Sequence, residues 1–356
     1  MTKGYALRVR VAMLAPPWIP VPAPAYGGIE EVVRLLCDGL AAAGHDVTLF
    51  APLGSESSGA DVRALEEPHP DDIQKAQFEV DHVARAFAEI DAASGRGEPY
   101  DVIHDHVGHA ALAMADRVSV PLVHTLHGPF TEEASRFYAE HGRKACIVAI
   151  SQAQLDDAPD AMGCGCVVHN PIDCAEWPYR EEKEDFLLWI GRMSPDKGPQ
   201  RAITAAREAG APLVLAGPIQ PGQDAFFAEE VEPRLGRDGI EYIGEADSDS
   251  KRDLYQRARA LLMPIRWPEP FGLVMVEALA CGTPVIAFRE GSAPEVVQDG
   301  ETGFVVEDEH AMAEAVARLG EIEPAICRRS CEQRFGVPAV VRGYEDVYRA
   351  ASAVRA

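Results

Sequence analysis

The 356-residue sequence has little basic charge: 33 lysines and arginines stand against 57 aspartates and glutamates, a formal net charge of −24 at pH 7. Because a general grip on nucleic acid needs clustered basic side chains, this balance argues against DNA or RNA as a partner. It also argues against adsorption to an anionic membrane surface. No apolar run approaches the roughly 20 residues that span a bilayer, so we expect no transmembrane segment.

Two further signatures are missing. Residues 7–11 alternate apolar and arginine side chains, which breaks up the core of a signal peptide, and we therefore expect a cytoplasmic protein. The eight cysteines lack the paired Cys-x-x-Cys spacing of zinc sites. We expect reduced cysteines and no metal at Cys164, Cys166 and Cys174.

Short apolar runs and amphipathic stretches alternate along both halves of the chain. This alternation predicts a parallel sheet covered by helices in each half. The expected strands are residues 9–14, 47–51, 102–104, 121–125 and 145–150, then 186–190, 213–216, 240–243, 260–263, 284–288 and 304–306. The sequence therefore predicts an α/β protein of two Rossmann-like domains. Because parallel sheets bind ligands at the carboxyl ends of their strands, we expect the domains to face each other across a cleft.

The polar, proline-containing segment 171–185 is the expected linker between the domains. We place the N-terminal domain at residues 1–173 and the C-terminal domain at residues 174–336. The last segment, 337–356, contains an amphipathic helix with valines and tyrosines at helical spacing. We expect this helix to pack back on the N-terminal domain.

The first candidate site is the loop 191–198, Gly-Arg-Met-Ser-Pro-Asp-Lys-Gly, which follows an expected strand and opens a helix. Arg192 and Lys197 are five residues apart, so both cations can converge on one anionic group. A guanidinium fork and an ammonium point charge together suit a diphosphate. The N–H groups of the following helix would add to the attraction. The alternative is a surface loop with two solvated cations.

The second candidate site is the segment 267–284, which follows the strand at 260–263 and contains a short helix starting at Phe271 or Gly272. Glu269 lies just before that helix. Glu277 lies inside it between apolar neighbours, where a carboxylate must face a polar ligand or be paired. The two carboxylates are placed to hold two ends of a hydroxyl-rich ligand. The alternative makes both of them solvated helix charges.

With these two segments the chain resembles the family-4 glycosyltransferases, retaining enzymes of the two-domain GT-B fold. The pattern Glu-Pro-Phe-Gly-x4-Glu following the Gly-Arg-x4-Lys-Gly loop carries the resemblance. It implies that Arg192 and Lys197 bind the donor diphosphate, that Glu269 contacts hydroxyls of the donor sugar and that Glu277 holds the nucleotide ribose. The backbone of Phe271, Gly272 and Leu273 would lie along the sugar and the phosphates; the run 289–295 could add backbone donors there.

The N-terminal half has matching features. Gly27 and Gly28 open the first helix, and such glycines let the backbone approach a phosphate closely. Because this is not the Gly-x-Gly-x-x-Gly fingerprint, we infer no dinucleotide cofactor. His127 follows a strand and, by the resemblance, contacts the transferred sugar; the alternative is a structural histidine. Trp18 and Tyr26 in the preceding loop either line an apolar acceptor site or simply pack.

Three other polar segments lie outside the two candidate donor motifs. A cluster of histidines and an aspartate follows the strand at 102–104, for which we prefer acceptor-site or structural roles over a metal: His104, Asp105, His106 and His109. The segment 169–171 reads His-Asn-Pro where relatives usually carry Pro-Asn-Gly, so the sequence departs from the family pattern at the expected hinge, around Asn170. Asp247 and Asp249 form a formal Asp-x-Asp, which we interpret as a helix N-cap.

The resemblance thus implies a retaining, metal-independent hexosyltransferase that uses a nucleoside diphosphate sugar as co-substrate and no cofactor. UDP-glucose is the expected donor, with GDP-mannose second. The acceptor is an unidentified small molecule, sugar or lipid. Two alternatives stay open: a nucleotide-sugar epimerase or hydrolase on the same scaffold, and a non-catalytic nucleotide-sugar binding protein.

Overall fold

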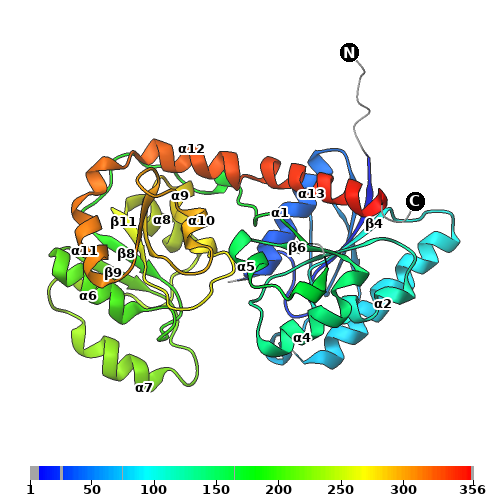
Figure 1. Ribbon diagram of the computed structural model, residues 1–356, viewed down its shortest axis with the longest axis horizontal. Coiled ribbons are helices and arrows are strands. Elements are labelled where there is room, and N and C mark those ends of the chain that lie inside the picture. Colours follow the sequence, from blue (N-terminus) through cyan, green and yellow to red (C-terminus); the bar gives the residue numbers. More distant parts are fainter. Residues whose placement is uncertain (1–7, 25–26, 74, 164, 354–356) are drawn as a thin grey trace, which may run out of the picture. The chain divides into compact units, whose positions relative to one another are not determined.

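The computed structural model describes residues 8–24, 27–73, 75–163 and 165–353. The chain divides into two compact units. Unit 1 comprises Met1–Pro171 and Val337–Ala356, and unit 2 comprises Ile172–Gly336. Each unit contains one parallel sheet with helices on its faces, as the alternating pattern predicted (Figure 1). Among the described residues, no helix has both the length and the apolar character needed to cross a bilayer.

The sheet of unit 1 has the strand order β3-β2-β1-β4-β5-β6-β7, and every neighbouring pair is parallel. Its strands are β1 (Arg10–Leu14), β2 (Asp46–Ala51), β3 (Asp61–Ala64), β4 (Val102–Asp105), β5 (Leu122–Thr125), β6 (Cys146–Ala149) and β7 (Gly165–Val167). Its helices are α1 (Gly28–Ala42), α2 (Ala76–Gly95), α3 (His109–Ala113), α4 (Glu132–His141), α5 (Gln152–Asp156) and α13 (Val337–Ala353). The apolar pattern of the sequence did not predict β3 and β7.

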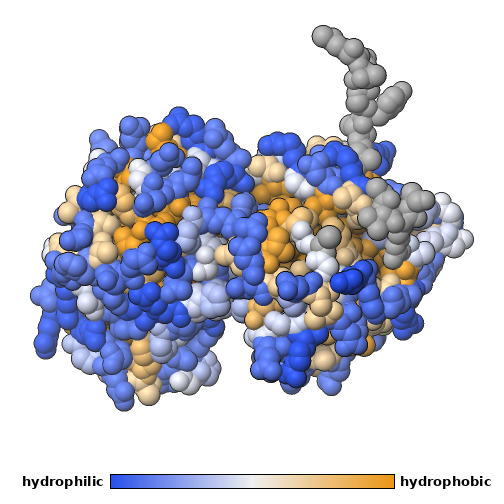
Figure 2. Space-filling model, viewed as in Figure 1, coloured by the Kyte–Doolittle hydropathy of each residue, from blue (hydrophilic) through white to orange (hydrophobic). Residues whose placement is uncertain are grey.

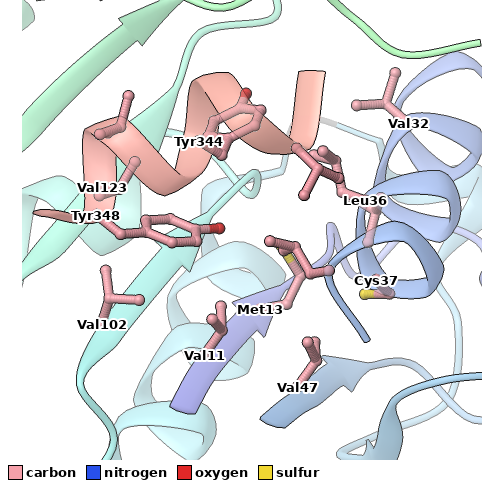
Figure 3. Close-up of a cluster of buried hydrophobic side chains, with 14 of the residues drawn as sticks. Val11, Met13, Val32, Leu36, Cys37, Val47, Val102, Val123, Tyr344 and Tyr348 are labelled. Carbon is pink, nitrogen blue, oxygen red and sulfur yellow. The ribbon is translucent and has the colours of Figure 1, made fainter. Parts of the chain in front are cut away.

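Two hydrophobic clusters cover the two faces of this sheet. On one face, α1 and α13 lie side by side, although more than 290 residues separate them in the sequence (Figure 1). Figure 3 shows Tyr344 and Tyr348 of α13 packed with Val11, Val102 and Val123 of the strands. Both tyrosine side chains are almost fully buried. The C-terminal helix therefore completes the core of unit 1.

The sheet of unit 2 has the order β10-β9-β8-β11-β12-β13 and is also entirely parallel. Its strands are β8 (Leu187–Ile190), β9 (Leu213–Ala216), β10 (Ile240–Tyr242), β11 (Ala260–Met263), β12 (Val285–Phe288) and β13 (Gly303–Val306). Its helices are α6 (Pro199–Ala209), α7 (Asp224–Phe226), α8 (Ser248–Arg257), α9 (Leu273–Ala280), α10 (Ala293–Val296), α11 (Glu309–Ala317) and α12 (Pro324–Arg334). Hydrophilic residues cover most of the face of unit 2 seen in Figure 2, in line with the acidic composition.

The polar segment 171–185, which we expected to be a linker, belongs almost entirely to unit 2. The Lys183 ammonium donates to the carbonyl oxygens of Gln256 and Cys281 at 3.0 and 2.8 Å and to Thr283 Oγ1 at 2.9 Å. The Ile172 N–H donates to the carbonyl of Phe335 at 2.9 Å, so a hydrogen bond joins the two ends of the chain segment that forms unit 2. Lys183 of this segment caps the carboxyl ends of α8 and α9, a role that its polar sequence does not distinguish from that of a linker.

Candidate active site

The strand order of unit 2 marks one position as the expected ligand site. Strands β9 and β10 follow β8 on one side, whereas β11, β12 and β13 lie on the other side. In open parallel sheets, ligands bind at such a reversal, outside the carboxyl ends of the two central strands. Those ends lead into residues 191–198 after β8 and residues 264–272 after β11. The two segments singled out from the sequence therefore meet at the same edge of one sheet.

Backbone contacts join these two loops. The Arg266 N–H donates to the carbonyl of Asp196 at 2.9 Å. Gly198 has a left-handed conformation with φ of 77°, and a Cβ there would lie 2.4 Å from the carbonyl oxygen of Pro264. Glycine at this position is therefore required twice, for its φ angle and for the close approach of the second loop. Gly198 also caps α6, whose first residue is Pro199.

The two cations of the first loop have different environments. The Arg192 side chain is 48% exposed and makes long contacts with Asp196 at 3.9 Å and Gln220 at 3.4 Å. The Lys197 side chain is only 17% exposed, and its ammonium forms an ion pair with Glu269 and lies 4.4 Å from the centre of the Trp267 ring. The sequence predicted both cations beside one ligand group. It did not predict that Lys197 contacts Glu269, a member of the second motif.

Glu269 is fixed on both its side chain and its backbone. The Trp267 Nε1–H donates to Glu269 Oε2 at 3.0 Å. The Ser292 N–H donates to the Glu269 carbonyl at 3.0 Å, and a Cβ on Gly291 would lie 2.4 Å from that oxygen. The segment 289–295 is therefore packed directly against the Glu269 backbone, which the sequence did not specify.

The residues between the two carboxylates form the start of a helix. Phe271 is buried and packs edge-on against Phe335, and its carbonyl accepts a hydrogen bond from Ser292 Oγ at 2.7 Å. Gly272 has a left-handed φ of 76° and serves as the N-cap, so α9 begins at Leu273. The predicted start at Phe271 or Gly272 was therefore one or two residues early, because the left-handed cap precedes the helix. The first N–H groups of α9 lie beside this loop, where helix N-termini favour anions.

Glu277 is the buried, paired carboxylate that its apolar neighbours predicted. Its Oε1 accepts a hydrogen bond from Lys251 Nζ at 2.7 Å, and its Oε2 accepts one from the Tyr255 hydroxyl at 3.0 Å. Both partners come from α8, one helical turn apart. The sequence did not indicate Lys251 and Tyr255 as partners, because nothing in a polar helix shows which buried group it will contact. Together these two hydrogen bonds hold the carboxylate in one orientation.

Unit 1 has its own reversal of strand order, between β1 and β4. The loop after β1 ends at Gly27, the N-cap of α1, and Gly28 is the first residue of that helix. A Cβ at Gly27 would lie 2.5 Å from the Cβ of Ala23, an atom that cannot move without its backbone, so a larger residue does not fit. Burial raises the pKa of Glu30. Trp18 of this loop is buried, whereas Tyr26 lies outside the described residues.

Four buried or half-buried histidines gather at the carboxyl ends of β4 and β5. His106 Nδ1 and His127 Nε2 are 2.8 Å apart, and their rings are stacked. His106 Nε2 is buried without a hydrogen-bond partner among the described residues. Burial, reinforced by neighbouring histidines, lowers the pKa of His104 and of His127 to about 3, so both are neutral at pH 7. One nitrogen of a neutral imidazole donates and the other accepts, which fits the single bond between His106 and His127.

The remaining members of this group are held by structural hydrogen bonds. His104 bonds to the Tyr348 hydroxyl at 2.7 Å and to Thr125 Oγ1 at 2.9 Å. Asp105 Oδ2 lies 2.6 Å from His124 Nδ1. His109 begins α3 and packs against aromatic rings. Of the two roles that we had left open, these contacts provide the structural one for His104 and Asp105.

Two sequence alternatives involve metal. Asp247 caps α8 by accepting a hydrogen bond from the Ser250 N–H at 2.8 Å, as predicted, while the Asp249 side chain is almost fully exposed. Within the described part of the chain, no three His, Cys, Asp or Glu side chains are grouped so as to hold a metal ion. Cys164 lies outside that part.

The segment 169–171 departs from the family pattern. There the Oδ1 atom of Asn170 is buried without a hydrogen-bond partner among the described residues.

Comparison with known proteins places these features in a family. The profile of the family "Glycosyltransferase Family 4" matches residues 26–176, and that of "Glycosyl transferases group 1" matches residues 176–334. The chain is 27% identical to glycogen synthase of Mycobacterium tuberculosis over 96% of its own length and 95% of that protein. It is 29% identical to D-inositol 3-phosphate glycosyltransferase of Acidothermus cellulolyticus, over 97% and 91% of the two chains.

A solved structure agrees with this result. The glycosyltransferase AviGT4, involved in avilamycin A biosynthesis, superimposes with a TM-score of 0.69 and 26% identity over 97% of this chain and 98% of its own. The two family profiles together run without a gap from residue 26 to residue 334, through both units and all the motif residues. The chain therefore belongs to the group 1, family-4 glycosyltransferases and has their GT-B fold.

Proposed function

We propose that this glycosyltransferase transfers a hexose, with retention of anomeric configuration, from a nucleoside diphosphate sugar held by unit 2. One observation supports the proposal most strongly. Lys197 and Glu269 come from two motifs 72 residues apart and contact each other at the strand-order reversal of unit 2. A cation for phosphate and a carboxylate for hydroxyl groups are thereby side by side, as a sugar diphosphate requires.

In this proposal Arg192 and Lys197 bind the diphosphate. Arg192 is exposed on the loop, and its contacts with Asp196 and Gln220 are long, so its guanidinium can turn towards a phosphate at little cost. Lys197 is half-buried beside the first turn of α6. Negative charge increases on the diphosphate as its bond to the sugar breaks. Preorganised cations there stabilise the transition state more than the bound donor.

Glu269 would accept hydrogen bonds from hydroxyls of the donor sugar, and Glu277 from those of the ribose. Each Glu277 oxygen already accepts one protein hydrogen bond and has a lone pair left for a second. The backbone of Phe271, Gly272 and Leu273 supplies N–H groups along the sugar and phosphates. UDP-glucose is the donor that we expect, and we assign no cofactor and no metal to the reaction.

We assign no protein general base. In the reaction that we propose, the acceptor hydroxyl attacks the anomeric carbon from the face that the diphosphate leaves, and the departing diphosphate takes the hydroxyl proton. His127, neutral at pH 7, is assigned a contact with the transferred sugar by the family resemblance. The acceptor, a small molecule, sugar or lipid, is assigned to unit 1.

A donor panel tests this proposal. A ligand that binds only the folded protein raises the melting temperature, so UDP-glucose, ADP-glucose and GDP-mannose are compared by thermal shift. We expect one of them to stabilise the wild type and to lose that effect in Arg192→Ala and Lys197→Ala. Stabilisation by none of them, or equal stabilisation of the variants, would contradict the donor site. Donor hydrolysis without acceptor would favour a hydrolase, and binding without turnover across an acceptor panel would favour a binding protein.

A further inference from the structure

Trp267 contacts both members of the Lys197–Glu269 pair. It lies in the loop between β11 and α9, half-buried and two residues before Glu269. Its indole Nε1–H donates to Glu269 Oε2 at 3.0 Å, and its ring face lies 4.4 Å from Lys197 Nζ. The same side chain thus offers a hydrogen-bond donor to the carboxylate and an aromatic face to the ammonium.

These two contacts matter because Lys197 has two anionic partners in the proposed donor site. Lys197 ion-pairs with Glu269, and the proposed function also requires Lys197 to contact a diphosphate. An ammonium has three N–H donors, but a lysine side chain is flexible and a strong anion competes for its position. If Lys197 alone held Glu269, the carboxylate would lose its orientation whenever the lysine turned towards phosphate. The indole N–H is a second donor that does not depend on the lysine.

The ring face acts on the lysine in the same way. An ammonium over an indole ring is attracted by the ring quadrupole, and this attraction strengthens where water is partly excluded. The Lys197 side chain is 17% exposed and the Glu269 side chain 13%, so both charges are largely removed from water. The ring therefore limits the range of positions that the ammonium adopts beside the loop.

We infer that Trp267 is a positioning residue of the donor site, holding Glu269 through its N–H and Lys197 through its ring. This inference rests on the proposed function. The loop backbone does not depend on the indole, because the Arg266 N–H donates to the Asp196 carbonyl and the Glu269 N–H to the Trp267 carbonyl at 2.8 Å. Side-chain substitutions at position 267 therefore leave these backbone bonds in place.

Three substitutions separate the two contacts. Trp267→Phe and Trp267→Tyr keep an aromatic face but remove the indole N–H, whereas Trp267→Leu removes both. Calorimetry measures the affinity for each nucleoside diphosphate and for its sugar conjugate, with the pairs UDP and UDP-glucose, ADP and ADP-glucose, and GDP and GDP-mannose. Circular dichroism and melting temperature identify the variants that fold. The second aromatic variant serves if the first does not.

We expect the aromatic variants to bind the free diphosphate within about twofold of wild type but to lose about three- to tenfold in the affinity for the sugar conjugate. This loss is smaller than the roughly 10–150-fold of a hydrogen bond to a charged group, because the indole orients Glu269 and is not itself the proposed sugar contact. Trp267→Leu should also weaken the free diphosphate, because it removes the ring beside Lys197, and should weaken the sugar conjugate further, because it removes both contacts. A merely structural tryptophan would lower both affinities equally in the aromatic variants, and that result would overturn the inference. So would wild-type affinities in all three variants while Lys197→Ala and Glu269→Ala are impaired. Normal binding in Lys197→Ala and Glu269→Ala would instead overturn the proposed donor site itself.

Discussion

Replacement of Glu277 by glutamine tests the ribose assignment in detail. The glutamine has nearly the same shape and keeps one acceptor oxygen, but it removes the negative charge that faces Lys251 and Tyr255. A hydrogen bond to a charged group contributes roughly 1.5–3 kcal/mol, which corresponds to about 10–150-fold in affinity. Because one acceptor remains, we expect a loss near the lower limit, about tenfold, in the affinity for UDP.

The assay compares UDP with 2′,3′-dideoxyuridine diphosphate, which lacks the ribose hydroxyls. If Glu277 accepts from those hydroxyls, Glu277→Gln should weaken UDP binding and leave the dideoxy ligand nearly unaffected. The control is Glu321→Gln, which removes an exposed carboxylate that is ion-paired with Arg318. An equal loss for both ligands would refute the reasoning, because the substitution would then act through the protein and not through the ribose.

The same substitution has a cost for stability. Lys251 and Glu277 are 16% and 12% exposed, so the substitution removes the Glu277 charge from beside a largely dry ammonium. Breaking a fully buried pair costs about 3–5 kcal/mol. Because glutamine still offers a carbonyl and the site retains some water contact, we expect a smaller decrease, measured as a lower melting temperature. Nucleotide titrations should therefore be made well below that temperature.

Three further predictions concern metal, acid and packing. Activity should survive EDTA, since the proposed site places protein cations beside the diphosphate and assigns no metal; complete loss restored by manganese would revive Asp247 and Asp249 as ligands. The free energy of unfolding should fall as the pH drops from about 6.5 towards 3, because His104 takes up a proton in the unfolded chain but not in the folded protein. The loss should reach about 2 kcal/mol by pH 5. His104→Asn should therefore flatten the dependence of the melting temperature on pH, and an unchanged slope would contradict this role of His104. Gly291→Ala should impair donor binding, because its Cβ would lie 2.4 Å from the Glu269 carbonyl oxygen and its φ is 50°; wild-type affinity would show that the loop yields.

The sequence predicted the two-domain architecture and most of its strands from short apolar runs. Apolar runs located most strands because a parallel strand is buried on both faces. The sequence did not predict β3 (Asp61–Ala64), an edge strand whose side chains are mostly exposed, or β7 (Gly165–Val167), which has only three residues. Neither segment contains an apolar run long enough to separate it from a loop.

In the candidate site, too, the sequence predicted some features and not others. The sequence indicated that Glu277 had to be paired or face a ligand, because its neighbours are apolar. It did not identify Lys251, 26 residues earlier, because an exposed-looking lysine on a polar helix has no local sign of a distant partner. The histidine group is the extreme case, since His104 bonds to Tyr348, 244 residues away. Partners of this kind are set by the packing of whole elements and not by spacing.

The most direct test of the account is the turnover of the donor by Arg192→Ala and Lys197→Ala, with acceptor transfer or slow donor hydrolysis as the assay. Removing one preorganised charge contact commonly costs on the order of 10²–10³ in rate, so each variant should lower kcat more than it raises the donor KM. The matched control is Arg318→Ala, which removes an exposed arginine from the same unit. Turnover close to wild type in both loop variants would contradict the diphosphate role of these cations, and with it the donor site at the β8–β11 edge.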